Sequence, residues 1–303
     1  MSSTTLPNDP RWPRAGHLFS SADESAADLT LIGVPAWRTS ISATGAHATP
    51  AAVRAALLRY STYSAEHGVD LATMRLVDAG DIEEPDGPAG EKRVITRLAH
   101  AQPNLGFLIA LGGDNSITYS VALGVWGEKI SQAGLITLDA HHDLRDGETN
   151  GSPVRRLIEA GLAGARVVQI GIADYSNSPE YAARARDLGI TVITRASLRT
   201  RSMADVISTA LAIAGAGGGP IHVDLDVDVC DRSVVPACPA AAPGGISADE
   251  LRQAAFLVAA DPRVSSLDIT EVDATIDAPD ARTVRLAALL VLEAAAGVCV
   301  RTS

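Results

Sequence analysis

Short apolar runs alternate along the chain with segments whose apolar residues recur at helical spacing. Eight runs have the length and the continuous hydrophobicity of strands that are buried on both faces. They begin at Asp28, Met74, Leu105, Gly134, Arg166, Ile190, Pro220 and Val264. Helical segments such as 50–61, 178–189 and 247–260 lie between them. This alternation predicts an α/β fold, with a parallel sheet covered by helices on both faces.

The start of the chain is polar and contains several prolines. Residues 1–27 therefore predict a loose N-terminal arm, while residues 28–303 show no linker-like break and predict a single domain. The N-terminus lacks the apolar core of a signal peptide. The longest apolar stretch, Leu286 to Val300, contains Glu293 and is too short to cross a bilayer. We expect a cytoplasmic protein that does not contact membranes.

The charge balance excludes several classes of protein. The 303 residues include 25 Lys+Arg and 36 Asp+Glu, which gives a formal charge of −11. An acidic chain is a poor ligand for nucleic acid, because that binding depends on neutralising phosphates. Lys92 and Lys129 are the only lysines and neither stands in a G-K-[ST] motif, which excludes a P-loop NTPase. The three cysteines form no C-x-x-C pair.

Polar residues gather where three of the predicted strands end. The motifs are GGDNS at 112–116, DAHHD at 139–143, and a run with Asp224, Asp226, Asp228 and Asp231. The carboxyl ends of parallel strands form the ligand crevice of such sheets, so we expect these side chains to meet. Converging carboxylates repel one another unless cations compensate, and oxygen donors with few nitrogens suit Mn²⁺. The pattern predicts a site for two metal ions, which could activate a water molecule.

These motifs resemble those of the ureohydrolases, the family of arginase, agmatinase and formimidoylglutamase. The family motifs G-G-D-H-S, D-A-H-x-D, D-x-D-x-x-D and a late E-V-x correspond to GGDNS, DAHHD, DVDVCD and ITEVD here. The resemblance extends from about Leu31 to Gly297. It implies a three-layer α/β/α sandwich around a mostly parallel eight-stranded sheet, and assembly into a homo-oligomer, either a trimer or a hexamer.

The resemblance also implies six ligands for two Mn²⁺ ions per subunit. They are Asp139 and Asp226 as bridging ligands, Asp143 and Asn115 on the first ion, and His141 and Asp228 on the second. Asn115 departs from the family, whose usual ligand at this position is His. The amide oxygen is a neutral and weaker donor, which lowers the expected occupancy of the first ion.

Three variable stretches are similar to those of the formimidoylglutamases. They are NGSP at 150–153, SNS at 176–178 and PACP at 236–239. The resemblance thus implies manganese-dependent hydrolysis of N-formimidoyl-L-glutamate to L-glutamate and formamide, a reaction of histidine degradation. A hydroxide that bridges the metals would attack the amidine carbon. Glu271 would hold the amidinium by paired hydrogen bonds, and Asp143 would carry a proton to the leaving amine.

The two carboxylates of this substrate need donors on an acidic chain. Candidates for substrate contacts, together with Glu271, are Arg145, Asn150, Ser152, Arg155 and Asn177. For Arg145 and Arg155 a surface salt bridge is the competing interpretation. Two other functions stay open: hydrolysis of another guanidino compound, such as agmatine or a guanidino acid, with release of urea, and a metal-impaired relative without turnover. Only Asn115 supports the last of these.

Overall fold

Nine parallel strands form the central sheet of the computed structural model, which describes residues 9–21, 26–101 and 104–301. These strands are β1 (Phe19–Ser21), β2 (Leu29–Val34), β5 (Leu76–Asp81), β6 (Phe107–Gly112), β7 (Gly134–Leu138), β8 (Val167–Ile172), β9 (Thr191–Thr194), β10 (Ile221–Asp226) and β11 (Val264–Thr270). Their order across the sheet is β1-β5-β2-β6-β11-β10-β7-β8-β9. Two short strands, β3 (Tyr63–Ser64) and β4 (Val69–Asp70), form a separate antiparallel pair.

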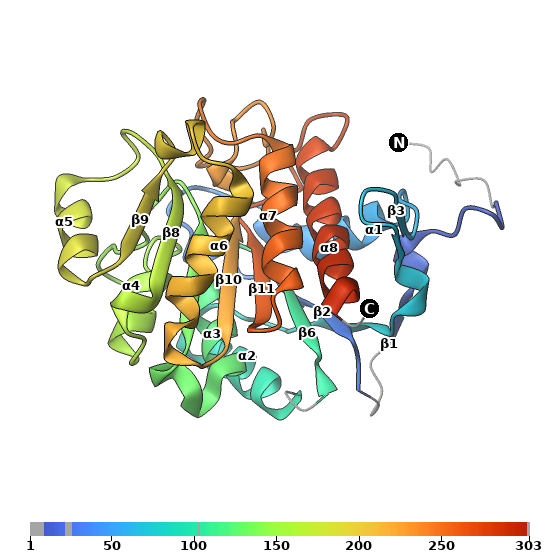
Figure 1. The fold of residues 1–303 in the computed structure, drawn as a ribbon, viewed down its shortest axis with the longest axis horizontal. Coiled ribbons are helices and arrows are strands. Elements are labelled where there is room, and N and C mark those ends of the chain that lie inside the picture. The colour runs from blue at the N-terminus through green and yellow to red at the C-terminus, as the bar shows by residue number, and fades with distance from the viewer. Residues whose placement is uncertain (1–8, 22–25, 102–103, 302–303) are drawn as a thin grey trace.

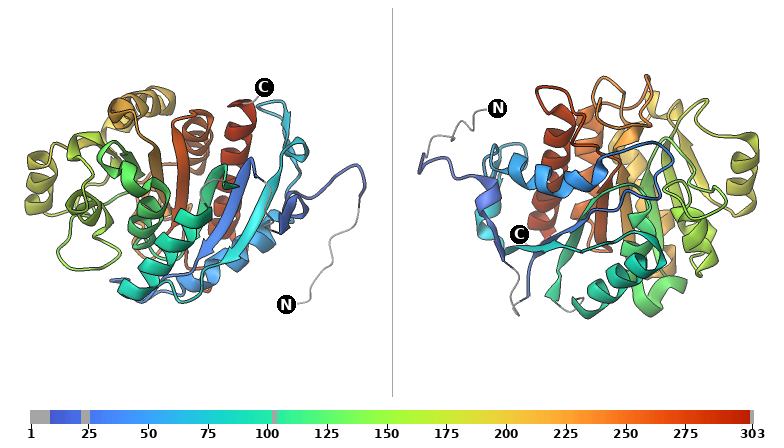
Figure 2. Two further views of the ribbon diagram at one scale, coloured as in Figure 1. Left: turned by 90° about the horizontal axis from the view of Figure 1, so that it is seen from below. Right: turned by 180° about the vertical axis from the view of Figure 1, so that it is seen from behind.

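Helices cover both faces of this sheet (Figure 1). They are α1 (Thr49–Leu57), α2 (Gly87–Ala101), α3 (Ile117–Trp126), α4 (Pro153–Glu159), α5 (Pro179–Asp187), α6 (Met203–Ala214), α7 (Ala248–Ala260) and α8 (Arg282–Arg301). Buried residues of α1, α6, α7 and α8 share one apolar cluster with the sheet, and those of α2, α3, α4 and α5 share another. Figure 2 shows the strands between these layers, so the predicted α/β/α sandwich is confirmed.

The sheet has one strand more than the eight that the sequence predicts. All eight predicted strands are present, with ends within two residues of the expected ones. The additional strand β1 lies inside the segment predicted as a loose arm, and pairs with β5 at the edge of the sheet, Phe19 opposite Leu76. Three residues carry no periodic signal, so the free edge of β5 determines this pairing. Residues 1–8 and 22–25 of the predicted arm lie outside the described residues.

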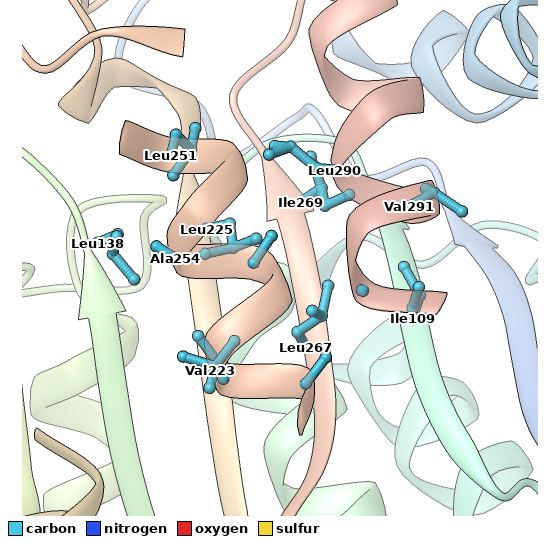
Figure 3. Close-up of a cluster of buried hydrophobic side chains, with 14 of the residues drawn as sticks. Ile109, Leu138, Val223, Leu225, Leu251, Ala254, Leu267, Ile269, Leu290 and Val291 are labelled. Carbon is cyan, nitrogen blue, oxygen red and sulfur yellow. The ribbon is translucent and has the colours of Figure 1, made fainter. Parts of the chain in front are cut away.

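The central strands β10 and β11 have faces of opposite character. Val223, Leu225, Leu267 and Ile269 point toward α7 and α8, where they pack in the larger apolar cluster (Figure 3). The alternate residues point to the other face. All six are polar and buried, and we call them the polar column: His222, Asp224, Asp226, Ser266, Asp268 and Thr270. The row of buried polar side chains therefore extends from the metal motif at the carboxyl ends of these strands into the middle of the sheet.

The C-terminal helix α8 belongs to the core. It has 20 residues and is long and apolar enough to cross a bilayer by length and composition, so the expectation that this stretch is too short is wrong. The helix begins at Arg282, four residues before the predicted apolar run, and ends at Arg301. Yet 78% of its apolar window is buried inside the protein, and Glu293 pairs with Arg252 of α7. Its apolar surface is used for packing.

The packing of α8 can be tested by truncating one buried side chain. Leu290 is a fully buried residue of α8 that packs against the sheet, so Leu290→Ala should lower the free energy of unfolding by about 2–5 kcal/mol, because it leaves a cavity. Urea denaturation measures the loss. Leu289→Ala is the control, since Leu289 is half-buried and outside both apolar clusters; it should cost about 1 kcal/mol or less. Equal losses would contradict the packing described here.

Candidate metal centre

The carboxyl ends of β7 and β10 bring the predicted acidic residues together. These strands are neighbours in the sheet, with Leu138 opposite Leu225. Two groups of possible ligand atoms form there, each with its members within 4.8 Å of one another. One group is Asp139, His141 and Asp228; the other is Asp139, Asp143 and Asp224. Asp139 belongs to both groups, which is the arrangement that a ligand shared between two ions requires.

The burial of these carboxylates favours bound cations. Asp139, Asp143, Asp224, Asp226 and Asp228 are all at most 5% exposed. Among the described residues, one oxygen each of Asp139 and Asp224 has no hydrogen-bond partner. Burying charged groups without compensation costs several kcal/mol each. Carboxylate oxygens with a single imidazole are donors that suit Mn²⁺, so these residues fit the metal that the sequence predicts.

His141 is the cation of this cluster in the protein alone. Its Nδ1 lies 2.8 Å from Oδ2 of Asp228 and 3.4 Å from Oδ1 of Asp139. Burial lowers the pKa of His141, but the two carboxylates outweigh it and raise that pKa to about 12. Burial, and then the charge of Asp228, raises the pKa of Asp139 to about 6. A metal ion that binds here must therefore displace protons.

The turn after β6 places Asn115 at the same centre. Gly113 has φ +48, and a Cβ there would lie 2.4 Å from the backbone oxygen of Ala36, so only glycine fits. Asn115 is buried, and its amide nitrogen donates to Asp143. Its amide oxygen accepts hydrogen bonds from the hydroxyls of Thr118 (2.9 Å) and Thr270 (3.2 Å). The oxygen expected to coordinate the first ion is thus directed to two hydroxyls, and its role as a ligand stays a prediction.

The two residues predicted to be catalytic share an uncommon backbone conformation. Asp143 has φ 53 and Glu271 has φ 63. Residues other than glycine adopt this region rarely, and they do so mostly where the surroundings fix a functional side chain. Burial, and then the charge of Asp139, raises the pKa of Asp143 well above its usual value. This backbone geometry supports a functional role for both residues.

Glu271 is held in place by two hydrogen bonds. Its Oε1 accepts from the backbone nitrogen of Asn115 and from Nδ2 of Asn150, both at 2.8 Å. Burial, and then the charge of Asp114, raises the pKa of Glu271 to about 8. A cationic group beside this carboxylate would lower that pKa, so the position favours a ligand with positive charge.

A cavity of about 490 Å³ opens onto these residues. Its lining includes Glu271 and three of the predicted substrate contacts, Arg145, Asn150 and Asn177. Arg145 is exposed, and in the part of the chain that the structure describes no carboxylate pairs with its guanidinium. The competing interpretation, a surface salt bridge of Arg145, is therefore not supported.

Two predicted substrate contacts do not line the cavity. Ser152 is fully buried, and its hydroxyl donates to the backbone oxygen of Thr149 at 2.8 Å. Arg155 donates through Nε to the backbone oxygen of Arg145 at 2.7 Å and pairs with Glu159. Placing Ser152 and Arg155 at the substrate is thus corrected, because their polar atoms stabilise the loop that carries Arg145. For Arg155 the salt bridge is the correct interpretation.

Two side-chain amides hold the loop at 140–143. Asn177 accepts from the backbone nitrogen of His142 and donates to the backbone oxygen of Ala140, both at 2.9 Å. Gln169 of β8 contacts Nδ1 of His142 at 2.6 Å and donates to its backbone oxygen at 2.8 Å. Gln169 is not among the predicted site residues, although a single amide in the apolar strand VVQIGI is a usable signal. Asp224, which stands two residues before Asp226, is also not among the predicted ligands.

Comparison with known proteins adds three relatives and a family. A family model described as the arginase family matches residues 27–297. The formimidoylglutamase of Halalkalibacterium halodurans is 36% identical over 300 residues, 95% of this chain and 93% of that protein. The crystal structure of formimidoylglutamase from Bacillus subtilis is similar with a TM-score of 0.90 and 33% identity, over 98% of this chain and 95% of that one. A crystal structure of Trypanosoma cruzi formiminoglutamase with Mn²⁺ has a TM-score of 0.89 and 25% identity, over 96% and 99%.

We expect Mn²⁺ binding to release at least one proton per chain. His141 carries this proton in the metal-free protein and must lose it to coordinate a metal. The affinity for Mn²⁺ should therefore rise with pH and fall as the solution becomes acidic. Calorimetry in two buffers of different ionisation enthalpy counts the protons.

His142→Gln is the control for this experiment. Burial lowers the pKa of His142 and keeps its ring neutral, so this variant should release as many protons as the unmodified chain. Binding of Mn²⁺ without proton release would contradict coordination by His141.

Proposed function

The chain belongs to the arginase family and hydrolyses C–N bonds of linear amidines, and from that premise we propose that its substrate is N-formimidoyl-L-glutamate. Water adds to the formimidoyl carbon, the bond from this carbon to the glutamate nitrogen breaks, and L-glutamate and formamide leave. The observation that carries the proposal is a cavity lined both by a fixed carboxylate, Glu271, and by Arg145, whose guanidinium has no carboxylate partner among the described residues. Formimidoylglutamases among the relatives support the same substrate.

We propose manganese as the cofactor, with two ions per subunit. The Mn²⁺ in the Trypanosoma cruzi relative supports this metal. The ligands would be Asp139, His141, Asp143, Asp226 and Asp228, and the bound ions would supply positive charge and lower the pKa of a water molecule. The intact set of five donors also speaks against a metal-impaired relative.

Two carboxylates of the protein take part in the proposed reaction. The amidinium is planar and cationic, so Glu271 can hold it by paired, charge-assisted hydrogen bonds. Asp143 accepts a proton from the attacking water and gives it to the nitrogen of the departing glutamate. The hydrogen bond that Nδ2 of Asn115 donates to Asp143 fixes the orientation of Asp143 for this transfer. No covalent intermediate with the enzyme is needed.

Arg145 distinguishes the proposed substrate from agmatine. A guanidinium at the edge of the cavity pairs with a carboxylate and repels the terminal amine of agmatine. Asn150 is held by Glu271 and by the backbone nitrogen of Ile41 (3.0 Å), so it shapes the opposite side of the amidine site. Cytoplasmic location and assembly into trimers or hexamers stay predictions.

The first test is turnover on formimidoylglutamate, agmatine, arginine and 4-guanidinobutyrate, with added Mn²⁺ and with metal content measured on the same sample. We expect the highest kcat/KM for formimidoylglutamate, with formamide as product and removal of metal by a chelator abolishing the activity. Release of urea from a guanidino compound at higher kcat/KM would refute the proposed substrate and keep the reaction class.

Arg145→Met tests how the substrate tail is recognised. Losing one charge-assisted hydrogen bond to a carboxylate costs about 1.5–3 kcal/mol, so KM for formimidoylglutamate should rise about tenfold to a hundredfold with a smaller change in kcat. Arg199→Met is the control, because Arg199 is exposed and lies outside the cavity. An unchanged KM in Arg145→Met would remove Arg145 from the substrate site.

A further inference from the structure

In the polar column, Asp224 is the next residue after the predicted ligand Asp226, counted away from the carboxyl end of β10. It is opposite Thr137 of β7 and Asp268 of β11, and all three side chains are fully buried. A carboxylate oxygen of Asp224 lies within 4.8 Å of ligand atoms of both Asp139 and Asp143. Two ligands on opposite sides of one divalent cation are separated by about twice the usual metal–oxygen distance of roughly 2.2 Å, so after small side-chain shifts one ion can contact all three carboxylates.

The hydrogen bonds of Asp224 leave a donor position open. Its Oδ1 accepts weakly from the hydroxyl of Thr270 at 3.4 Å. Its Oδ2 is buried and has no hydrogen-bond partner in the described part of the chain, and the same holds for Oδ2 of Asp139. Buried carboxylate oxygens are normally satisfied, and an ion between these side chains would satisfy both.

Asn115 does not present an oxygen to this ion. Its Oδ1 is taken by the hydroxyls of Thr118 and Thr270, and its Nδ2 faces Asp143. An N–H group repels a cation, and reversing the amide would lose the hydrogen bond to Asp143 and require both threonine hydroxyls to accept instead of donate. The position that family resemblance gives to Asn115 is therefore filled by a group that orients Asp143.

We propose that Asp224 is a ligand of the first metal ion, in place of Asn115. This inference rests on the proposed metal centre and adds Asp224 to Asp139, Asp143 and Asp226 as donors to the first ion. It gives the first ion an anionic donor at a centre where Asn115 offers only a neutral amide. The carboxylate of Asp224 would reach this ion from the polar column, in the middle of the sheet.

The competing interpretation is a proton shared between Asp224 and Asp268. Oδ1 of Asp268 also lacks a hydrogen-bond partner among the described residues, and Oδ2 of Asp268 contacts Nε2 of His222 at 3.1 Å. In that case Asp224 would be neutral, would form hydrogen bonds next to the site and would not bind metal. The amide of Asn can replace a protonated carboxyl as a hydrogen-bond donor, but it cannot replace an anionic ligand.

Asp224→Asn separates the two interpretations by a direct count of bound metal. The unmodified chain should bind two Mn²⁺ and give the electron paramagnetic resonance spectrum of a spin-coupled pair. We expect Asp224→Asn to bind the first ion at least tenfold more weakly, and to show the spectrum of a single Mn²⁺ when about one equivalent is retained. Asp231→Asn is the matched control, because Asp231 accepts hydrogen bonds from Ser233 and Gly244 outside both ligand groups; it should bind two ions.

A second variant keeps the test decisive if Asp224→Asn loses metal through a folding defect. Adding Asn115→His to Asp224→Asn supplies a nitrogen donor, and should restore binding of the first ion and the coupled spectrum. Two ions bound with unchanged affinity in Asp224→Asn would overturn the inference, and so would a single ion in the unmodified chain. Because no substrate is used, failure of the proposed substrate would leave these results unaffected.

Discussion

Mutual repulsion among buried carboxylates at the ends of β7 and β10 is the constraint on which the centre of this protein depends. Five aspartates lie there with almost no contact with solvent, and no arrangement of hydrogen bonds alone could keep them charged. The protein supplies one cation, His141, and several donors, among them the backbone nitrogen of Ala140, 3.0 Å from Asp228. The remaining charge has to be met by bound cations or by protons, which makes metal binding and proton release two sides of one equilibrium.

The rest of the fold offsets the cost of this centre. On β10 and β11 one face is polar throughout, while the other face packs Val223, Leu225, Leu267 and Ile269 under two helices. The apolar layer of α7 and α8 thus stabilises the strands that carry the polar column. Strained positions such as Asp143 and Glu271 persist because neighbouring hydrogen bonds fix them. Stability and chemistry are separated onto opposite faces of the same two strands.

Much of this architecture could be predicted, because it depends on local patterns. The eight buried strands are continuous apolar runs, and the two ligand groups follow from side chains that alternate at the carboxyl ends of β7 and β10. The misses share a physical cause, since they depend on how side chains and strand edges are oriented in the folded chain. Strand β1 needs the edge of β5, Ser152 and Arg155 bond backbone atoms of their own loop, and the Asn115 amide is oriented by Thr118 and Thr270. Spacing along the chain carries no information about such orientation.

Charge alone cannot account for selectivity between a formimidoyl and a guanidino substrate. A guanidino acid has a cationic head and an anionic tail, as formimidoylglutamate does, so Arg145 and Glu271 would attract both. The difference lies at the reacting carbon, which bears a hydrogen in one compound and a third nitrogen in the other. That nitrogen needs space and a hydrogen-bond acceptor, and a site without the acceptor leaves its N–H groups unpaired. Near Glu271, the side-chain amides of Asn115 and Asn150 direct N–H groups toward carboxylates. Their oxygens are therefore not available to accept a hydrogen bond from the third nitrogen of a guanidino substrate. In the proposed function, discrimination therefore depends on the orientation of these two amides, and in the proposed metal centre the orientation of Asn115 leaves the first ion to Asp224.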